Sequence, residues 1–91
     1  MMKFNIGDMV EFKTEYDSTK SGKIVNVTSE MDSYDEMRLN DGVALYWSKK
    51  MKKWTPVKEK NRDTVFLEVE LLRGGYNFIY MEEVVSYESI K

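Results

Sequence analysis

The chain has 91 residues, of which 42% are hydrophobic and 33% charged, and it contains neither cysteine nor histidine. This length suits one folded domain, and the missing residue types exclude disulfides, Cys/His zinc sites, cysteine nucleophiles and imidazole catalysis. The net charge of −2 hides an asymmetry: residues 49–62 hold seven Lys/Arg and one Glu, so they carry +6 and the rest −8. Without disulfides or an apolar run of membrane length, we expect a cytoplasmic protein.

The first third of the chain predicts two strands joined by a polar loop. Gly7-Asp8 forms a turn before a strand over 9–13, whose apolar residues alternate. A polar loop over 15–22 then leads to a β-branched strand over 23–29. The residues predicted to face inward are Val10, Phe12, Ile24 or Val25, and Val27.

The middle of the chain predicts an acidic connection over 30–36, followed by a hairpin. Asn40-Asp41-Gly42 lies between two apolar runs, which is a strong hairpin signal. The strand over 43–48 places Val43, Leu45 and Trp47 on one face, predicted to point inward. A further strand over 52–57 is confined to a sheet edge, because Pro56 lacks an amide donor.

The last third predicts three more strands separated by turns. KEKNRD, at 58–63, is a turn before the strand over 64–72, in which Glu68 and Glu70 face away from the apolar positions. Arg73-Gly74-Gly75 turns the chain into YNFIYM, and EEVVSYE predicts one helical turn and a short strand. The residues predicted to face inward are Val65, Leu67, Val69, Leu71, Phe78 and Val85.

Six or seven short strands without a helical period predict a small barrel or sandwich. FNIGDMVEF followed by SGKIVNV resembles the opening of SH3-like small barrels of the KOW/Tudor kind, and YMEEVVSYE resembles their last turn and strand. The resemblance covers residues 4–29 and 76–88, and it implies an all-β fold: a single SH3-like β-barrel domain over 1–91, with an inserted basic β-hairpin. Such barrels bind nucleic acid or protein segments. The residues that match are Gly7, Asp8, Val10, Gly22, Ile24 and Val27.

A basic strip is the first candidate site. Lysines can neutralise phosphates, and a tryptophan can offer a stacking face to a base, with Trp54 the better candidate. Lysines on an edge strand also prevent edge-to-edge aggregation, and the scarcity of arginine argues against specific base readout. The strip consists of Tyr46, Lys49, Lys50, Lys52, Lys53, Trp54, Lys58, Lys60 and Arg62.

An acidic surface is the second candidate, because it could dock onto a basic protein partner or simply keep the domain soluble. Its residues are Asp32, Asp35, Glu36, Glu68 and Glu70. Glu68 and Glu70, about 7 Å apart along a strand, are the only candidate catalytic pair, and alternation alone explains them. DSTKSGK lacks the spacing of a phosphate-binding loop, and residues 32–36 lack that of a calcium loop. We therefore predict no catalytic residue, no metal site and no cofactor.

Two functions follow from these surfaces. The favoured one is a non-enzymatic protein-interaction or inhibitor module, encoded by a phage and aimed at a host factor; the codon bias implied by frequent Lys, Asn, Ile, Tyr and Met suggests such a source. The alternative is a sequence-tolerant nucleic-acid-binding protein that uses the basic strip. Net acidity and the few arginines favour the protein partner, and no contact with a membrane is predicted.

Overall fold

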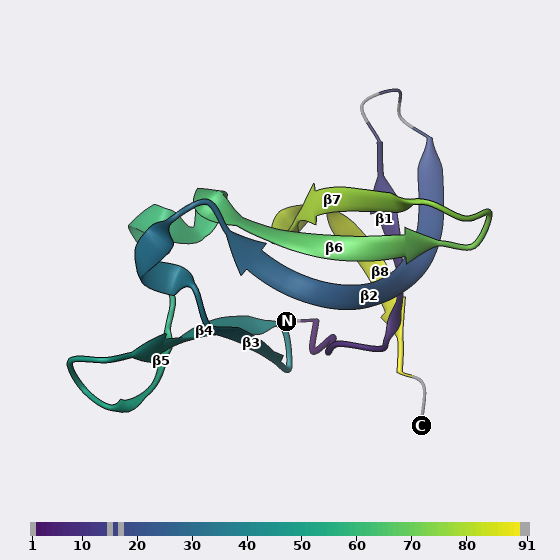
Figure 1. Cartoon of the computed structure of the whole chain (residues 1–91). Coiled ribbons are helices and arrows are strands. Elements are labelled where there is room, and N and C mark those ends of the chain that lie inside the picture. Colours follow the sequence, from purple (N-terminus) through teal and green to yellow (C-terminus); the bar gives the residue numbers. More distant parts are fainter. Residues whose placement is uncertain (1, 15, 17, 90–91) are drawn as a thin grey trace.

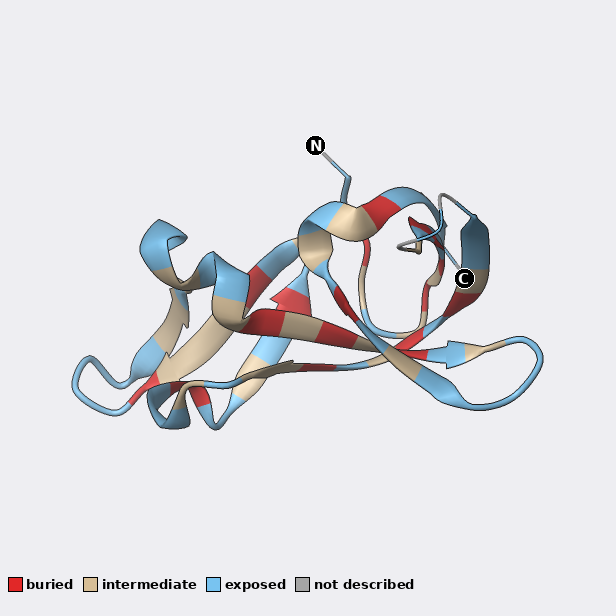
Figure 2. Ribbon diagram, turned by 90° about the horizontal axis from the view of Figure 1, so that it is seen from above, coloured by how far each residue is buried: buried red, intermediate tan, exposed pale blue. Residues whose placement is uncertain are grey.

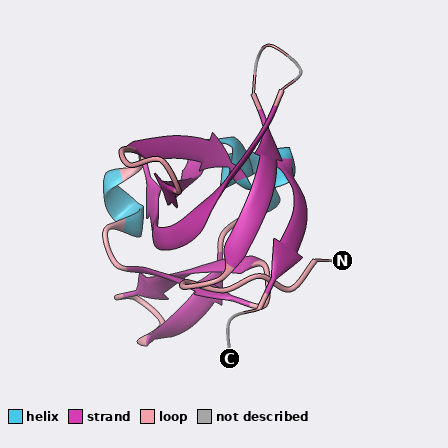
Figure 3. Ribbon diagram, turned by 90° about the vertical axis from the view of Figure 1, so that its right-hand side faces the viewer, coloured by secondary structure: helices cyan, strands magenta, loops and turns pink. Residues whose placement is uncertain are grey.

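The computed structural model describes residues 2–14, 16 and 18–89, which form two antiparallel β-sheets with three short 3-10 helices between strands (Figure 1). Seen with helices and strands in separate colours, strands make up nearly all of the framework (Figure 3). The all-β prediction is therefore confirmed. Residues 1 and 90–91 of the predicted domain, and residues 15 and 17 of the predicted loop, lie outside the described part.

The larger sheet has five strands in the order β7-β6-β2-β1-β8. At its centre the long β2 pairs with β1 on one side and β6 on the other, and it curves around the core (Figure 1). The 3-10 helix η3 (Met81–Glu83) joins β7 to β8, which confirms the predicted helical turn and short strand. No ladder connects β7 to β8 in the described residues, so both are sheet edges. The strands are β1 (Met9–Lys13), β2 (Thr19–Ser29), β6 (Val65–Leu71), β7 (Tyr76–Tyr80) and β8 (Val84–Glu88).

The smaller sheet has the order β3-β4-β5 and lies in the sequence between β2 and β6. Its strands are β3 (Met37–Asn40), β4 (Val43–Ser48) and β5 (Lys53–Pro56). The helix η1 (Asp32–Tyr34) precedes this sheet and η2 (Glu59–Thr64) follows it, where the sequence predicted an irregular connection and a turn. The β4–β5 hairpin contains the predicted lysines, and β5 is an edge strand as its proline requires. The inserted basic hairpin is thus confirmed.

The core lies where the inner faces of the two sheets meet, and buried positions from both sheets converge there (Figure 2). Ala44 and Leu39 of the small sheet pack against the large sheet, together with the half-buried Met37 and Val57. No ladder joins the two sheets within the described residues, so this packing is what holds their inner faces together. The buried core residues are Phe4, Val10, Phe12, Ile24, Val27, Leu39, Ala44, Val65, Leu67, Val69, Ile79 and Val84.

Two inward assignments from the sequence were wrong by one residue, whereas Ile24 and Val27 of β2 are buried as predicted. In β7 the core residue is Ile79, and Phe78 is 62% exposed; in β8 it is Val84, and Val85 is 45% exposed. Both faces of these strands carry apolar side chains, so alternation alone could not select the buried one. In β2 a bulge between Ile24 and Asn26 shifts the register, so Ile24 and Val27 are both buried although they are three residues apart.

For β4 of the small sheet, the predicted inner and outer faces are reversed. Ala44 and Ser48 of β4 are buried, whereas Val43, Leu45 and Trp47 lie on the other face, which points away from the core. The inner face of β4, with Ala44, Tyr46 and Ser48, is less hydrophobic than the outer face, with Val43, Leu45 and Trp47. The hydrophobic residues of β4 therefore predicted the wrong face of this strand as the buried one.

The N-terminal segment fastens the turn between β3 and β4. The Asn5 side-chain amide donates to Asp41 Oδ1 at 3.0 Å, and the Asp41 backbone N–H donates to Asn5 Oδ1 at 2.9 Å. The Gly42 N–H donates to the Phe4 carbonyl at 2.8 Å, and Phe4 itself is buried. Gly42 has φ +79°, and a Cβ at this position would collide with the Met2 carbonyl oxygen. The turn therefore requires glycine both for its backbone conformation and for space.

We expect Gly42→Ala to lower the free energy of unfolding more than Gly74→Ala, measured by urea denaturation. Gly74 has φ +90° with no heavy atom near the position of a Cβ, so its substitution incurs only the left-handed backbone cost, about 1–2 kcal/mol. Gly42→Ala incurs the same backbone cost, and its new Cβ must also displace the N-terminal segment at Met2. We expect this displacement to cost about 1 kcal/mol or more in addition. Equal losses in the two variants would show that the N-terminal segment does not restrain the turn.

Candidate interaction surfaces

Four lysines surround the turn between β4 and β5, and we call Lys49, Lys50, Lys52 and Lys53 the lysine tip. The turn is closed by the Lys52 N–H, which donates to the Ser48 carbonyl at 2.7 Å, while the Met51 N–H donates to Ser48 Oγ at 3.1 Å. Ser48 is buried, so it anchors the turn, and all four lysines are exposed. The tip thus presents four positive charges on a hydrogen-bonded hairpin at one end of the molecule (Figure 1).

The other predicted basic residues do not join this tip directly. Lys58, Lys60 and Arg62 lie at or within η2, beyond the end of β5. The acidic η1 contacts both elements: Tyr34 packs its ring on Tyr46 of β4 at 4.3 Å, and its hydroxyl accepts a hydrogen bond from the Asn61 side chain of η2 at 2.9 Å. The basic strip is therefore two groups, one at the β4–β5 turn and one at η2.

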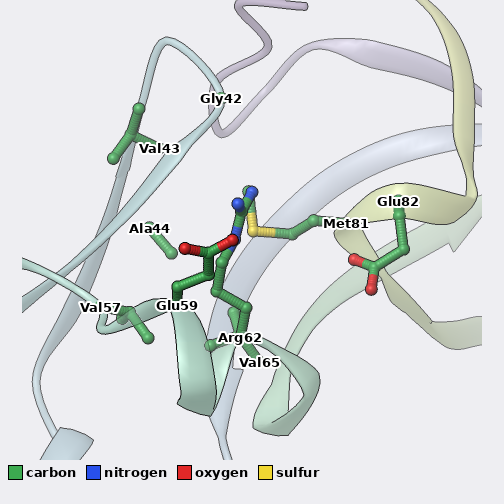
Figure 4. Close-up of a pocket in the computed structure, with 9 residues that line it drawn as sticks. All are labelled: Gly42, Val43, Ala44, Val57, Glu59, Arg62, Val65, Met81 and Glu82. Atoms are coloured by element: carbon green, nitrogen blue, oxygen red, sulfur yellow. The ribbon is translucent and has the colours of Figure 1, made fainter.

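Arg62 lines a small crevice between the small sheet, η2 and η3. Its guanidinium lies near Glu59 and the sulfur of Met81, over apolar walls that include Ala44, Val57 and Val65 (Figure 4). The crevice has a volume of about 280 Å³, at the lower limit for small-molecule pockets, roughly 300–1,000 Å³. We infer that Arg62 covers the seam between the two sheets.

Both tryptophans lie on the face of the small sheet that points away from the core. Trp47 of β4 and Trp54 of β5 are directly paired, with ring centroids 5.5 Å apart in an edge-to-face arrangement. The guanidinium of Arg38, on β3, lies 4.2 Å from the centroid of the Trp54 ring. Tyr46, in contrast, points to the opposite face and packs on Tyr34. From the sequence, Tyr46 and Trp54 are predicted to be binding residues, and Trp47 is predicted to point inward.

The predicted acidic residues separate into two places. Asp32, Asp35 and Glu36 are exposed in and after η1. Glu68 and Glu70 lie on the outer face of β6, where Glu68 is paired with Phe78 of β7, and Glu70 with Tyr76. The acidic surface proposed from the sequence is thus not one patch.

A row of exposed aromatic side chains accompanies the second acidic group. Tyr76, Phe78 and Tyr80 alternate along β7 and are 58%, 62% and 39% exposed, and the ring of Phe66 packs on Tyr80 at 4.8 Å. We call Phe66, Glu68, Glu70, Tyr76, Phe78 and Tyr80 the acidic-aromatic face. Sequence reasoning missed its aromatic part, although the YNFIY alternation contained the signal. A groove of about 320 Å³ beside Phe66 and Phe78 also contains Glu30.

A hydrogen bond joins the acidic and aromatic parts of this face. The Tyr76 hydroxyl donates to Glu70 Oε2 at 3.2 Å. The Glu70 carboxylate raises the pKa of Tyr76 through its negative charge and by accepting this hydrogen bond, both of which favour the protonated phenol. The phenol therefore remains protonated to a higher pH than a free tyrosine.

Within the described ranges no helix is long and apolar enough to cross a membrane. In those same ranges no group of three Asp or Glu side chains is placed to hold a metal ion. Searches against protein-family models, curated proteins and solved structures find no match to this chain.

The Tyr76–Glu70 contact predicts a specific pH dependence. Glu70→Gln removes the negative charge, so we expect the pKa of Tyr76 to fall, measured as the ring ¹³Cζ shift of Tyr76 during a pH titration. In the wild type, the raised pKa means that stability from this contact is complete below the unfolded-state pKa and decreases as pH rises through the folded-state value. An unchanged Tyr76 titration in Glu70→Gln would show that the two side chains do not interact in solution.

Proposed function

We propose that this protein is a non-enzymatic binding module that docks an extended, basic segment of another protein along β7 and the acidic-aromatic face. The observation that supports it most strongly is an uncharged, aromatic edge strand next to two carboxylates. Natural sheets protect their exposed edges with lysine, proline or bulges, because an open edge invites pairing with another chain. β5 has Lys53 and Pro56, whereas YNFIY in β7 has no such residue.

An extended segment could add to β7 as a further strand. The outer edge of β7 has no neighbouring strand in the described part of the sheet, so an incoming chain could pair with its backbone, except at the Tyr80 N–H, which donates to Glu83 Oε1 at 3.2 Å. Alternate side chains of that segment would then lie beside Tyr76, Phe78 and Tyr80. Main-chain hydrogen bonds would supply affinity, and these alternating contacts would supply specificity.

The charge of the face selects a basic segment. A lysine or arginine over an aromatic ring is attracted by the ring face, which contributes about 0.5–1 kcal/mol at an exposed site. Glu68 and Glu70 add carboxylates behind the aromatic row, and Glu30 lines the groove beside Phe66. The same carboxylates would repel a phosphate backbone, so this face favours protein over nucleic acid.

The strand order supports, as part of this proposal, the SH3-like resemblance. The matching residues lie in β1, in β2 and in the turn before β1, and the closing motif spans β7, η3 and β8. On this interpretation the five-stranded sheet is the barrel, and residues 30–64 are an insertion between its second and third strands. An inhibitory action on a host factor and a phage origin stay predictions from the sequence.

We expect a fluorescein-labelled nine-residue peptide of alternating lysine and valine to bind the protein, measured by fluorescence anisotropy. The same peptide with glutamate in place of lysine should not bind. Glu68→Lys combined with Glu70→Lys should weaken binding of the lysine peptide at least tenfold, about 1.4 kcal/mol. The reason is that it replaces both carboxylates of the acidic-aromatic face with repulsive charges.

The matched control is Asp32→Lys combined with Asp35→Lys, which changes the net charge equally but at η1. We expect it to lose less affinity than the Glu68/Glu70 variant, because Asp32 and Asp35 are not among the residues that line the aromatic row or its groove. Phe78→Ser should also weaken binding without unfolding the domain, because Phe78 is 62% exposed. Equal losses in both charge variants, or full affinity in Phe78→Ser, would contradict docking on this face.

A further inference from the structure

We infer that the outer face of the small sheet is a second, separate binding site, and that its ligand is single-stranded nucleic acid. The site consists of Arg38, Trp47, Trp54 and the lysine tip. The observations that support this inference differ from those that support docking of a basic segment. The site lies at the opposite end of the molecule from the β6–β7 turn (Figures 1 and 2).

Three adjacent strands contribute one planar group each to this face. Trp47 and Trp54 meet edge to face at 5.5 Å, and Arg38 stacks its guanidinium 4.2 Å from the Trp54 ring centroid. Arg38 is exposed, and both indoles are half-buried. Unpaired bases stack on aromatic rings and on arginine guanidinium planes, so the cluster offers suitable surfaces that are already ordered by contact with one another.

The face adjoins a groove rather than a flat surface. Arg38, Leu45 and Trp54 form one side of a groove of about 510 Å³, and Ile6 and Val25 form the other. Its mixed apolar and cationic lining suits a base with its attached phosphate. A duplex, with its bases already stacked on one another, could not use these surfaces, which is why the inferred ligand is single-stranded.

The charge of the small sheet is opposite to that of the rest of the protein. Residues 37–56 contain Arg38 and the four lysines of the tip against Asp41 alone, a net charge of +4, so the remaining residues carry −6. A polyanion is attracted to this segment and repelled elsewhere, which confines it to this sheet. Lysines act as point charges and stacking tolerates any base, so binding is expected to be tolerant of sequence.

The neighbouring acids define the path of the strand across the site. The backbone N–H of Trp47 donates to the backbone carbonyl of Glu36 at 3.0 Å. The acidic segment Asp35-Glu36 therefore lies on the β3 side of the sheet. β4 is the central strand, and β5, with Lys53 and Trp54, forms the opposite edge. We expect the nucleic acid to follow β5 from the groove to the lysine tip, away from Glu36.

The test uses fluorescein-labelled dT15, rU15 and a 15-base-pair duplex with the full chain, by anisotropy and by tryptophan fluorescence. We expect both single strands to bind and to quench the tryptophans, and the duplex to bind more weakly. Four neutralised phosphates predict a slope of roughly −3 in log K against log salt, so affinity should fall about fifty-fold between 50 and 200 mM salt. Trp54→Leu should weaken binding about five-fold or more, through the lost stack.

Matched charge variants distinguish this site from general electrostatic attraction. Lys49→Glu combined with Lys50→Glu should abolish binding, whereas Lys13→Glu combined with Lys20→Glu, with the same change in net charge, should retain most of it. Glu68→Lys combined with Glu70→Lys should still bind dT15, which keeps this outcome separate from the peptide test. Absence of binding at 50 mM salt, equal loss in both lysine pairs, or binding only to vesicles of anionic lipid would overturn the inference.

Discussion

The pairing of β2 with β6 is the constraint on which the rest of the structure depends. Gly22 permits it at one end, because a Cβ there would collide with Val69 and lie 2.6 Å from the Glu70 carbonyl oxygen. At the other end, Ser29 Oγ and Thr64 Oγ1 are 2.8 Å apart, and the Glu30 N–H donates to the Thr64 carbonyl. The whole insertion therefore leaves and rejoins the large sheet at one point. The same register turns Glu68 and Glu70 outward.

This arrangement places basic and acidic residues on different parts of the molecule, although both kinds are interspersed along the sequence. The insertion places the lysine tip at one end, and the β6–β7 hairpin directs the aromatic row and its carboxylates away from it. The edge strands β5 and β7 differ: β5 is protected by lysine and proline, whereas β7 has aromatic side chains and no charged residue. A nearly neutral protein thereby gains two faces with opposite preferences, which supports separate partners for the two sheets.

The sequence predicted most strand positions, since Asn-Asp-Gly and Pro56 act locally, but β2 begins at Thr19, within the loop predicted over 15–22. It failed where the buried side chain could not be recognised from hydrophobicity. β4 buries Ala44 and Ser48 while exposing Leu45 and Trp47, and β7 offers apolar residues on both faces, so Phe78 was taken for core instead of Ile79. These same errors concealed the candidate sites, because Trp47 and Phe78 were assigned to the interior. The sequence pattern also could not show that Tyr34 of η1 contacts Tyr46 and Asn61, because these contacts form only through tertiary packing.

The central claim is that β7 and its acidic-aromatic face form a docking surface distinct from the lysine tip. The most direct measurement is a ¹H–¹⁵N titration of the full chain with the alternating lysine–valine peptide. The account predicts shifts confined to the amides of β6 and β7, with the indole N–H signals of Trp47 and Trp54 unmoved. Shifts centred on β4 and β5, or the same small shift across the whole chain, would contradict it.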